Sequence, residues 1–100
     1  MIIDGAALRP RPTRMVTRRE IEVACCAAEG MSNAEAARHL NLGIETIRSH
    51  AKHARQKTGA RTRAQVVAEL LAARLMVYDS RAGRFIPNAI MFGGWNETQR

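Results

Sequence analysis

Residues 30–59 read GMSNAEAARHLNLGIETIRSHAKHARQKTG, a stretch that carries the start and stop signals of two consecutive helices. Ser32 is followed three positions later by Glu35, which is the spacing of a capping box at the start of a helix. We expect this helix to run to Leu40, because the Asn-Leu-Gly sequence at 41–43 then turns the chain.

A second helix is predicted from Ile44 to Thr58, because Gly59 supplies a residue that readily adopts the left-handed conformation ending a helix. Two short helices joined by a three-residue turn are typical of the helix-turn-helix, whose second helix enters the major groove of DNA. At about 100° per residue, the second helix separates into an inward stripe and an outward polar face. The inward stripe comprises Ile47, Ala51, Ala54 and Thr58, and the outward face comprises Glu45, Ser49, Lys52, His53 and Gln56.

Two further helices flank this pair. A capping box at Thr17–Glu20 predicts a helix that runs to Glu29, and Thr62–Gln65 opens a last helix that we expect to end near Leu75. We therefore predict a mainly α domain of four helices over residues 16–75.

The two ends of the chain differ from this domain. Residues 1–15 are rich in proline and arginine, which predicts a flexible basic arm. Residues 76–100 form a tail in which alternating residues around a glycine-containing turn predict a β-hairpin of Met76–Asp79 with Arg84–Pro87. The tail is expected to pack on the helices or on a second subunit, because it carries Tyr78, Phe85, Ile86, Ile90, Met91, Phe92 and Trp95.

The charge of the chain points to a polyanionic partner. Sixteen Lys and Arg residues against nine Asp and Glu residues give a formal net charge of +7. Residues 46–68 contain no acidic side chain, which makes sense mainly where phosphates neutralise the positive face. Membrane binding is not expected, because the helices carry mainly Ala and Val rather than bulky anchors. The first fourteen residues lack the features of a secretory signal, so we expect a cytoplasmic protein.

Catalytic and metal sites are not predicted. His50 and His53 are three apart, but no nearby carboxylate or cysteine completes a metal site. Ser49 lies four residues before His53, yet no third group orients that imidazole for hydrolysis. Cys25 and its neighbour Cys26 are read as small apolar residues of a partly buried helix, because adjacent helical cysteines cannot form an unstrained disulfide. We expect no enzymatic activity and no cofactor.

Three segments together resemble the LuxR/GerE-type helix-turn-helix domain of bacterial transcriptional regulators. They are VTRREIEV at 16–23, GMSNAEAARHLNL at 30–42 and ETIRSHAKHARQKTGARTRAQVV at 45–67. The resemblance covers about sixty residues and implies a four-helix unit whose third helix reads the major groove and whose fourth pairs two subunits. Domains of this family normally follow a receiver or ligand-binding domain, and one hundred residues leave no length for one, so a free-standing regulator is expected.

Carried over position by position, the resemblance places Arg48, Ser49 and Lys52 at DNA base edges. Contacts with the DNA backbone are expected from Arg18, Arg19, Thr46, His50, Arg55, Lys57, Arg61 and Arg63. The expected function is sequence-specific regulation of transcription by a homodimer on double-stranded DNA. The alternative is an adaptor that uses the same fold to bind RNA polymerase, a sigma factor or another regulator.

The sequence also departs from the family pattern. Gly43 stands where a Ser or Thr usually caps the third helix, at a cost of a few tenths of a kcal/mol. Smaller residues replace the usual Leu, Ile or Val side chains at Ala24, Ala36, Ala51, Ala54 and Thr58. A thin core is therefore predicted, and the aromatic tail is the segment expected to fill the missing volume.

Overall fold

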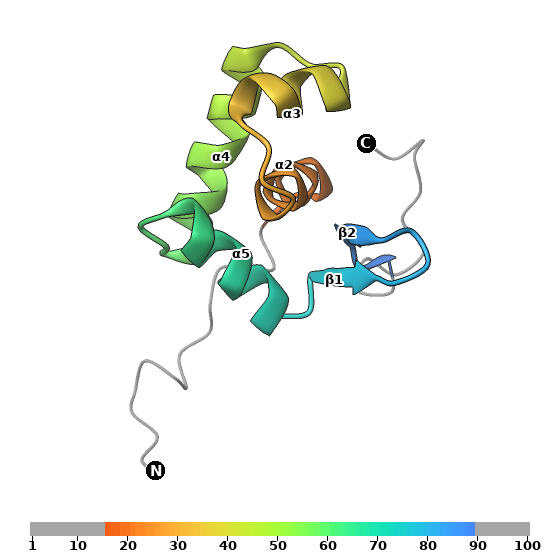
Figure 1. Ribbon diagram of the computed structural model, residues 1–100. Coiled ribbons are helices and arrows are strands. Elements are labelled where there is room, and N and C mark those ends of the chain that lie inside the picture. Colours follow the sequence, from red (N-terminus) through yellow and green to blue (C-terminus); the bar gives the residue numbers. More distant parts are fainter. Residues whose placement is uncertain (1–15, 90–100) are drawn as a thin grey trace.

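A computed structural model describes residues 16–89 and has four helices followed by a two-stranded hairpin (Figure 1). The predicted mainly α domain and the predicted hairpin are both confirmed. The predicted arm at 1–15 and the end of the tail at 90–100 lie outside the described residues. The elements are α2 (Arg18–Ala28), α3 (Asn33–Leu40), α4 (Ile44–Thr58), α5 (Arg63–Ala72), β1 (Met76–Asp79) and β2 (Arg84–Pro87).

Both predicted capping boxes are present. At the start of α2, the Thr17 hydroxyl accepts from the Glu20 amide at 3.1 Å, and Glu20 Oε1 accepts from the Thr17 amide at 2.9 Å. Ser32 and Glu35 make the same reciprocal pair at the start of α3, at 3.1 and 2.7 Å. Each box satisfies two amides that the helix itself cannot pair, so these local sequences are sufficient to fix where α2 and α3 begin.

The last helix, α5, is shorter than predicted. Thr62 caps its start, but the helix ends at Ala72 and not near Leu75, so the predicted end was wrong. Arg74 adopts a left-handed conformation with φ 63°, and the Leu75 amide turns back to the Leu70 carbonyl at 2.9 Å. Leu75 itself is buried. Burial of this residue in the core ends the helix, although no glycine marks the position in the sequence.

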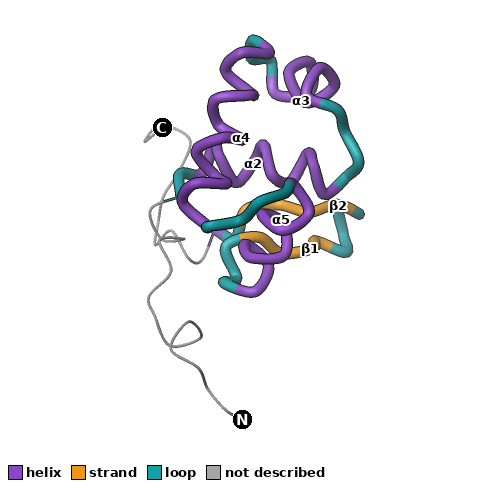
Figure 2. The backbone as a smooth tube through the Cα atoms, turned by 90° about the vertical axis from the view of Figure 1, so that its left-hand side faces the viewer, coloured by secondary structure: helices purple, strands orange, loops and turns teal. Residues whose placement is uncertain are grey.

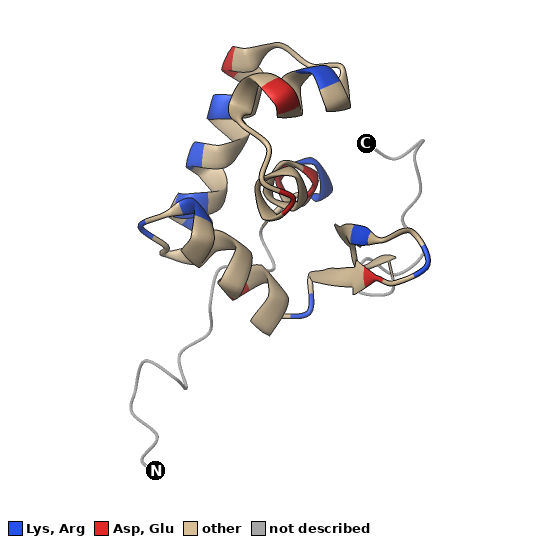
Figure 3. Cartoon of the chain, viewed as in Figure 1, with Lys and Arg blue, Asp and Glu red and all other residues tan. Residues whose placement is uncertain are grey.

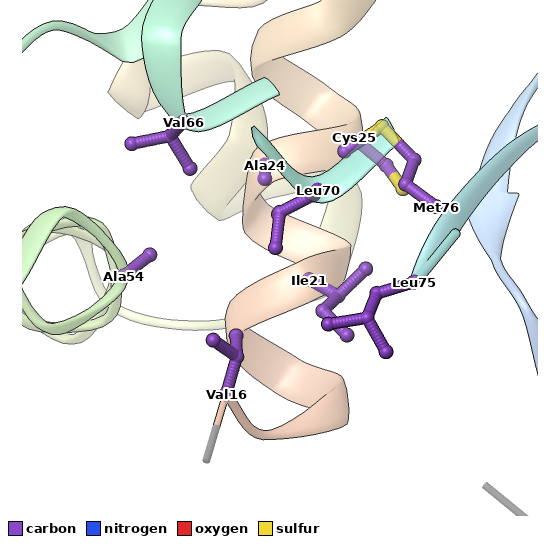
Figure 4. Packing of buried hydrophobic residues seen from close by; sticks show 9 residues of the cluster. All are labelled: Val16, Ile21, Ala24, Cys25, Ala54, Val66, Leu70, Leu75 and Met76. Carbon is purple, nitrogen blue, oxygen red and sulfur yellow. The ribbon is translucent and has the colours of Figure 1, made fainter. Parts of the chain in front are cut away.

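Helix α2 lies at the centre of the fold, with α4, α5 and the hairpin arranged around it (Figures 1 and 2). Two apolar clusters pack against it. Figure 4 shows the first cluster, which joins α2 to α4, α5 and the start of β1 through Val16, Ile21, Ala24, Cys25, Ala54, Val66, Leu70, Leu75 and Met76. The second cluster joins α2 to α3 and α4 through Val23, Cys26, Ala36, Ala37 and Ile47.

The predicted thin core is visible as a small cavity between α2, α3, α4 and α5. It measures about 30 Å³, and its walls include Ala24, Ala27, Ala36, Ala51 and Ala54. The hairpin does pack on α2, because Phe85 lies against the first cluster and its amide donates to Glu29 Oε2 at 2.7 Å. No residue of the hairpin lines this cavity, however, so the described part of the tail does not fill the volume beside the alanines.

Candidate nucleic-acid interface

Helix α4 presents one face to the core and the other to solvent. Asn41, in the left-handed conformation at φ 57°, ends α3, and α4 begins three residues after it. On the inner face, Ile47, Ala54 and Thr58 are buried, and the Thr58 hydroxyl donates to the Ala54 carbonyl at 2.8 Å. Ala51, the fourth member of the predicted inward stripe, is only half-buried. The orientation predicted from the helical period is therefore confirmed.

The three residues predicted to read bases lie together on the outer face of α4. Arg48, Ser49 and Lys52 are all exposed. The Arg48 guanidinium makes an ion pair with Glu45 at 2.6 Å, but the two side chains are 56% and 80% exposed. Such exposed pairs contribute about 0–1 kcal/mol, so the pair does not prevent Arg48 from turning to a better acceptor.

Some of the residues predicted to contact phosphates are accessible beside this face. Thr46, Arg55 and Arg61 are exposed. Within residues 16–89, the side chains of Arg55 and Arg61 have no hydrogen-bonding or ionic partner. Figure 3 shows Lys and Arg residues along the outer side of α4 and around its connection to α5. A basic strip thus runs from α4 into the start of α5.

Other predicted phosphate contacts already have partners inside the chain. Arg18 and Arg19 lie 3.4 and 3.0 Å from carboxylate oxygens of Glu22 on their own helix. Arg63, at the start of α5, donates to the Met31 carbonyl at 2.5 Å and so ties α5 to the connection between α2 and α3. A phosphate would have to compete with these interactions.

Lys57 is the most strongly engaged of these residues. Its ammonium lies 2.9 and 3.0 Å from the two carboxylate oxygens of Glu20, whose side chain is only 4% exposed. His53 Nδ1 lies 3.8 Å from the same carboxylate. Glu20 therefore caps α2 and also attaches α4 to it. The sequence revealed the cap, but it gave no signal for a pairing across 37 positions.

His50 sits at the edge of the α2–α4 contact and is half-buried. Its Nδ1 is buried and has no hydrogen-bond partner in the described part of the chain. Burial lowers the pKa of His50 below its ordinary value of 6.5, and the nearby positive charge of Arg19 acts in the same direction, while Glu20 opposes it. The neutral imidazole can donate one hydrogen bond to a phosphate, but it contributes no positive charge at neutral pH.

The cysteines are buried in the core of the same domain. Desolvation, together with neighbouring negative groups, raises the pKa of the Cys25 thiol to about 12. The pKa of Cys26 is also raised by burial. Across residues 16–89, no three His, Cys, Asp or Glu side chains are grouped as metal ligands, and no helix is long and apolar enough to cross a bilayer.

Comparison with known proteins identifies the domain. The sequence profile described as "GerE: Bacterial regulatory proteins, luxR family" matches residues 14–70. The chain is 37% identical over 60 residues to the HTH-type transcriptional activator RamA of Corynebacterium glutamicum, covering 60% of this chain and 21% of RamA. It is 29% identical over 65 residues to the oxygen regulatory protein NreC of Staphylococcus carnosus, covering 65% of this chain and 30% of NreC.

The matched region corresponds to the four helices and ends before the hairpin. The chain spans less than a third of the length of these two relatives, so the comparison concerns the shared domain alone. The family profile covers more than half of the chain, from the residue pair before Val16 to Leu70 in α5. With helices, turn and profile in agreement, this chain belongs to the luxR family of bacterial regulatory proteins.

Proposed function

We propose that this chain is a sequence-specific regulator of transcription that binds double-stranded DNA in the cytoplasm as a homodimer. The observation that carries the proposal is the outer face of α4, where Arg48, Ser49 and Lys52 are exposed and play no part in the core. Arginine can form a bidentate pair with guanine O6 and N7, lysine reaches the same acceptors singly, and the short serine permits close approach.

The basic strip beside this face would hold α4 in the major groove of DNA. Arg55 and Arg61 would contact phosphates directly, with Thr46 and His50 as neutral donors. Phosphate contacts fix the position of the protein on the duplex and most of the salt dependence of its affinity, whereas base contacts determine which sequence is preferred. The roles proposed for the α4 residues therefore predict different consequences for their loss.

Dimerisation through α5 is supported by its exposed side. Ala64, Ala68 and Leu71 follow one another at helical spacing and are exposed, and Leu71 is 38% exposed. Small residues around one larger apolar side chain allow two helices to approach closely. Leu71→Asp should convert a dimer to a monomer in analytical ultracentrifugation, with thermal stability of the monomer preserved.

The decisive experiment is selection of bound fragments from random double-stranded DNA by the purified chain. A defined motif is expected, and Arg48→Ala should change the preferred base at one or two positions, at a cost of about 1–3 kcal/mol for the original motif. Arg81→Ala removes the same charge from the exposed hairpin turn and should leave the motif unchanged.

If the chain binds all sequences alike and Arg48→Ala behaves like Arg81→Ala, the base-reading assignment is wrong. Absence of any selected motif, combined with tight binding to RNA polymerase or another regulator, would favour the adaptor function instead.

A further inference from the structure

A groove lies between the hairpin and the helices, away from α4. Its volume is about 450 Å³, within the range of roughly 300–1,000 Å³ that is typical of ligand-binding clefts. One wall comes from α2, its connection to α3 and the end of α3, and the other comes from β2 and the turn before it. The apolar part of the lining includes Cys26, Met31, Leu40, Phe85, Ile86 and Pro87.

The described chain ends at the edge of this groove. Pro87 lines it, and the next residue, Asn88, is fastened by two hydrogen bonds. Its amide donates to the Leu75 carbonyl at 2.9 Å, and its side-chain nitrogen donates to the Arg74 carbonyl at 2.8 Å. These bonds fix the backbone next to Pro87, so the described chain ends beside the groove. Eleven residues can extend about 36 Å, whereas the four residues of β2 span about 13 Å.

The composition of this segment suits the groove. Residues 90–96 read IMFGGWN, which includes two aromatic side chains and no charge. The groove combines apolar side chains with four polar ones, Glu22, Glu29, His39 and Arg84, and its carboxylates can accept from an indole N–H. Gly93 and Gly94 allow the chain to turn between the aromatic residues.

We propose that residues 90–96 fold back into this groove of their own chain and seat Phe92 and Trp95 against its apolar walls. The arrangement would cover apolar surface on the groove walls and on the segment alike. Tethering favours the segment over a free partner, because a short linker gives an effective concentration in the millimolar range. This inference does not depend on the proposed DNA-binding function, because α4 takes no part in the groove.

Trp95 is the single tryptophan of the chain and reports directly on this contact. In the folded full-length protein, its fluorescence should be shifted to shorter wavelength, and acrylamide should quench it severalfold less than in urea-unfolded protein. Both properties should be unchanged on dilution through the monomer–dimer range. A water-like emission in the folded chain would refute the proposal, and a shift that disappears on dilution would assign the groove to the tail of a second copy.

Substitution provides the matched comparison. Ile86→Asp places a charge in the groove wall and should return the Trp95 emission to that of a solvated indole, with helix content retained in circular dichroism. Ile44→Asp makes the same change at a 36% exposed position on α4 and should leave the emission unchanged. Equal effects of the two variants, or no effect of Ile86→Asp, would contradict the proposal.

A second measurement needs no substitution, in case Ile86→Asp does not fold. Nuclear Overhauser contacts between the Trp95 indole and the methyl groups of Leu40 and Met31 are expected in the unmodified chain. An assigned indole without any contact to these groups would overturn the proposal.

Discussion

Filling the alanine-lined cavity should stabilise the protein, and Ala36→Val is the substitution best placed to do so. Ala36 is 3% exposed, lies on α3 and lines the cavity of about 30 Å³. Valine adds two methyl groups, worth about 1.6 kcal/mol when buried, against a helix-propensity cost of about 0.5 kcal/mol. At about 24 cal/mol per Å³, removing a 30 Å³ cavity gives a similar gain of about 0.7 kcal/mol.

The free energy of unfolding should therefore rise by about 1 kcal/mol, which corresponds to about 4–8 °C in Tm for a domain of this size. Urea denaturation followed by circular dichroism measures the first quantity, and a thermal scan measures the second. Both measurements should be made at one protein concentration, because any self-association would also change the apparent stability.

Two valine substitutions on the same helix are matched controls. Ala34 is exposed, so Ala34→Val should lose only the helix-propensity term of about 0.5 kcal/mol. Ala37 is 9% exposed and does not line the cavity, so Ala37→Val should cost about 1–3 kcal/mol through overpacking. If Ala36→Val is no more stable than Ala34→Val, the cavity does not accept the added volume and the reasoning is refuted.

Three further predictions concern the contact between α2 and α4. Glu20→Gln should lower the free energy of unfolding, measured by urea titration, by about 1–3 kcal/mol. The loss is less than for a fully buried pair, because the Lys57 side chain is 30% exposed. Glu35→Gln, at the matching but exposed cap, should cost under about 1 kcal/mol in the same measurement. Burial lowers the pKa of His50 in the folded chain, so the unfolded chain binds a proton more readily. Tm should therefore fall as the pH drops from the ordinary pKa of 6.5 through the lowered value. His50→Gln should flatten this fall in thermal scans between pH 7 and 5. Lys57→Ala should lower Tm and leave the salt dependence of DNA binding unchanged. Arg55→Ala should leave Tm unchanged and reduce the slope of log affinity against log salt concentration by about 0.9. A reduced slope for Lys57→Ala would instead show that Lys57 contacts phosphate.

Local signals in the sequence were sufficient for most of the fold. The two capping boxes predicted the starts of α2 and α3 because a cap depends only on residues three positions apart. The hairpin strands were predicted with the bounds that the structure has, and Gly83 adopts φ 70° in the turn between them. Alternation and a turn glycine are likewise local features.

Interactions between distant residues explain where sequence reasoning was wrong or incomplete. The end of α5 depends on burial of Leu75 and Met76 against α2, and no nearby residue in the sequence indicates this burial. The thin core was predicted from residue size alone, yet the sequence did not reveal that the hairpin packs elsewhere on α2 and leaves the cavity open. Side-chain size predicts that volume is missing, but only the packing of whole elements determines what occupies it.

The same limitation decides how the basic residues are interpreted. The sequence shows that a residue is a lysine, but it does not show whether that lysine pairs with a buried carboxylate or is free to contact phosphate. Lys57 points to Glu20 on α2, whereas Lys52, five positions earlier on the same helix, is exposed and has no such partner among residues 16–89. Counting positive charges therefore does not by itself distinguish the residues of α4 that stabilise the fold from those available to a phosphate. Where a charge is already neutralised inside the fold, its loss should affect folding, and where it is not, its loss should affect binding.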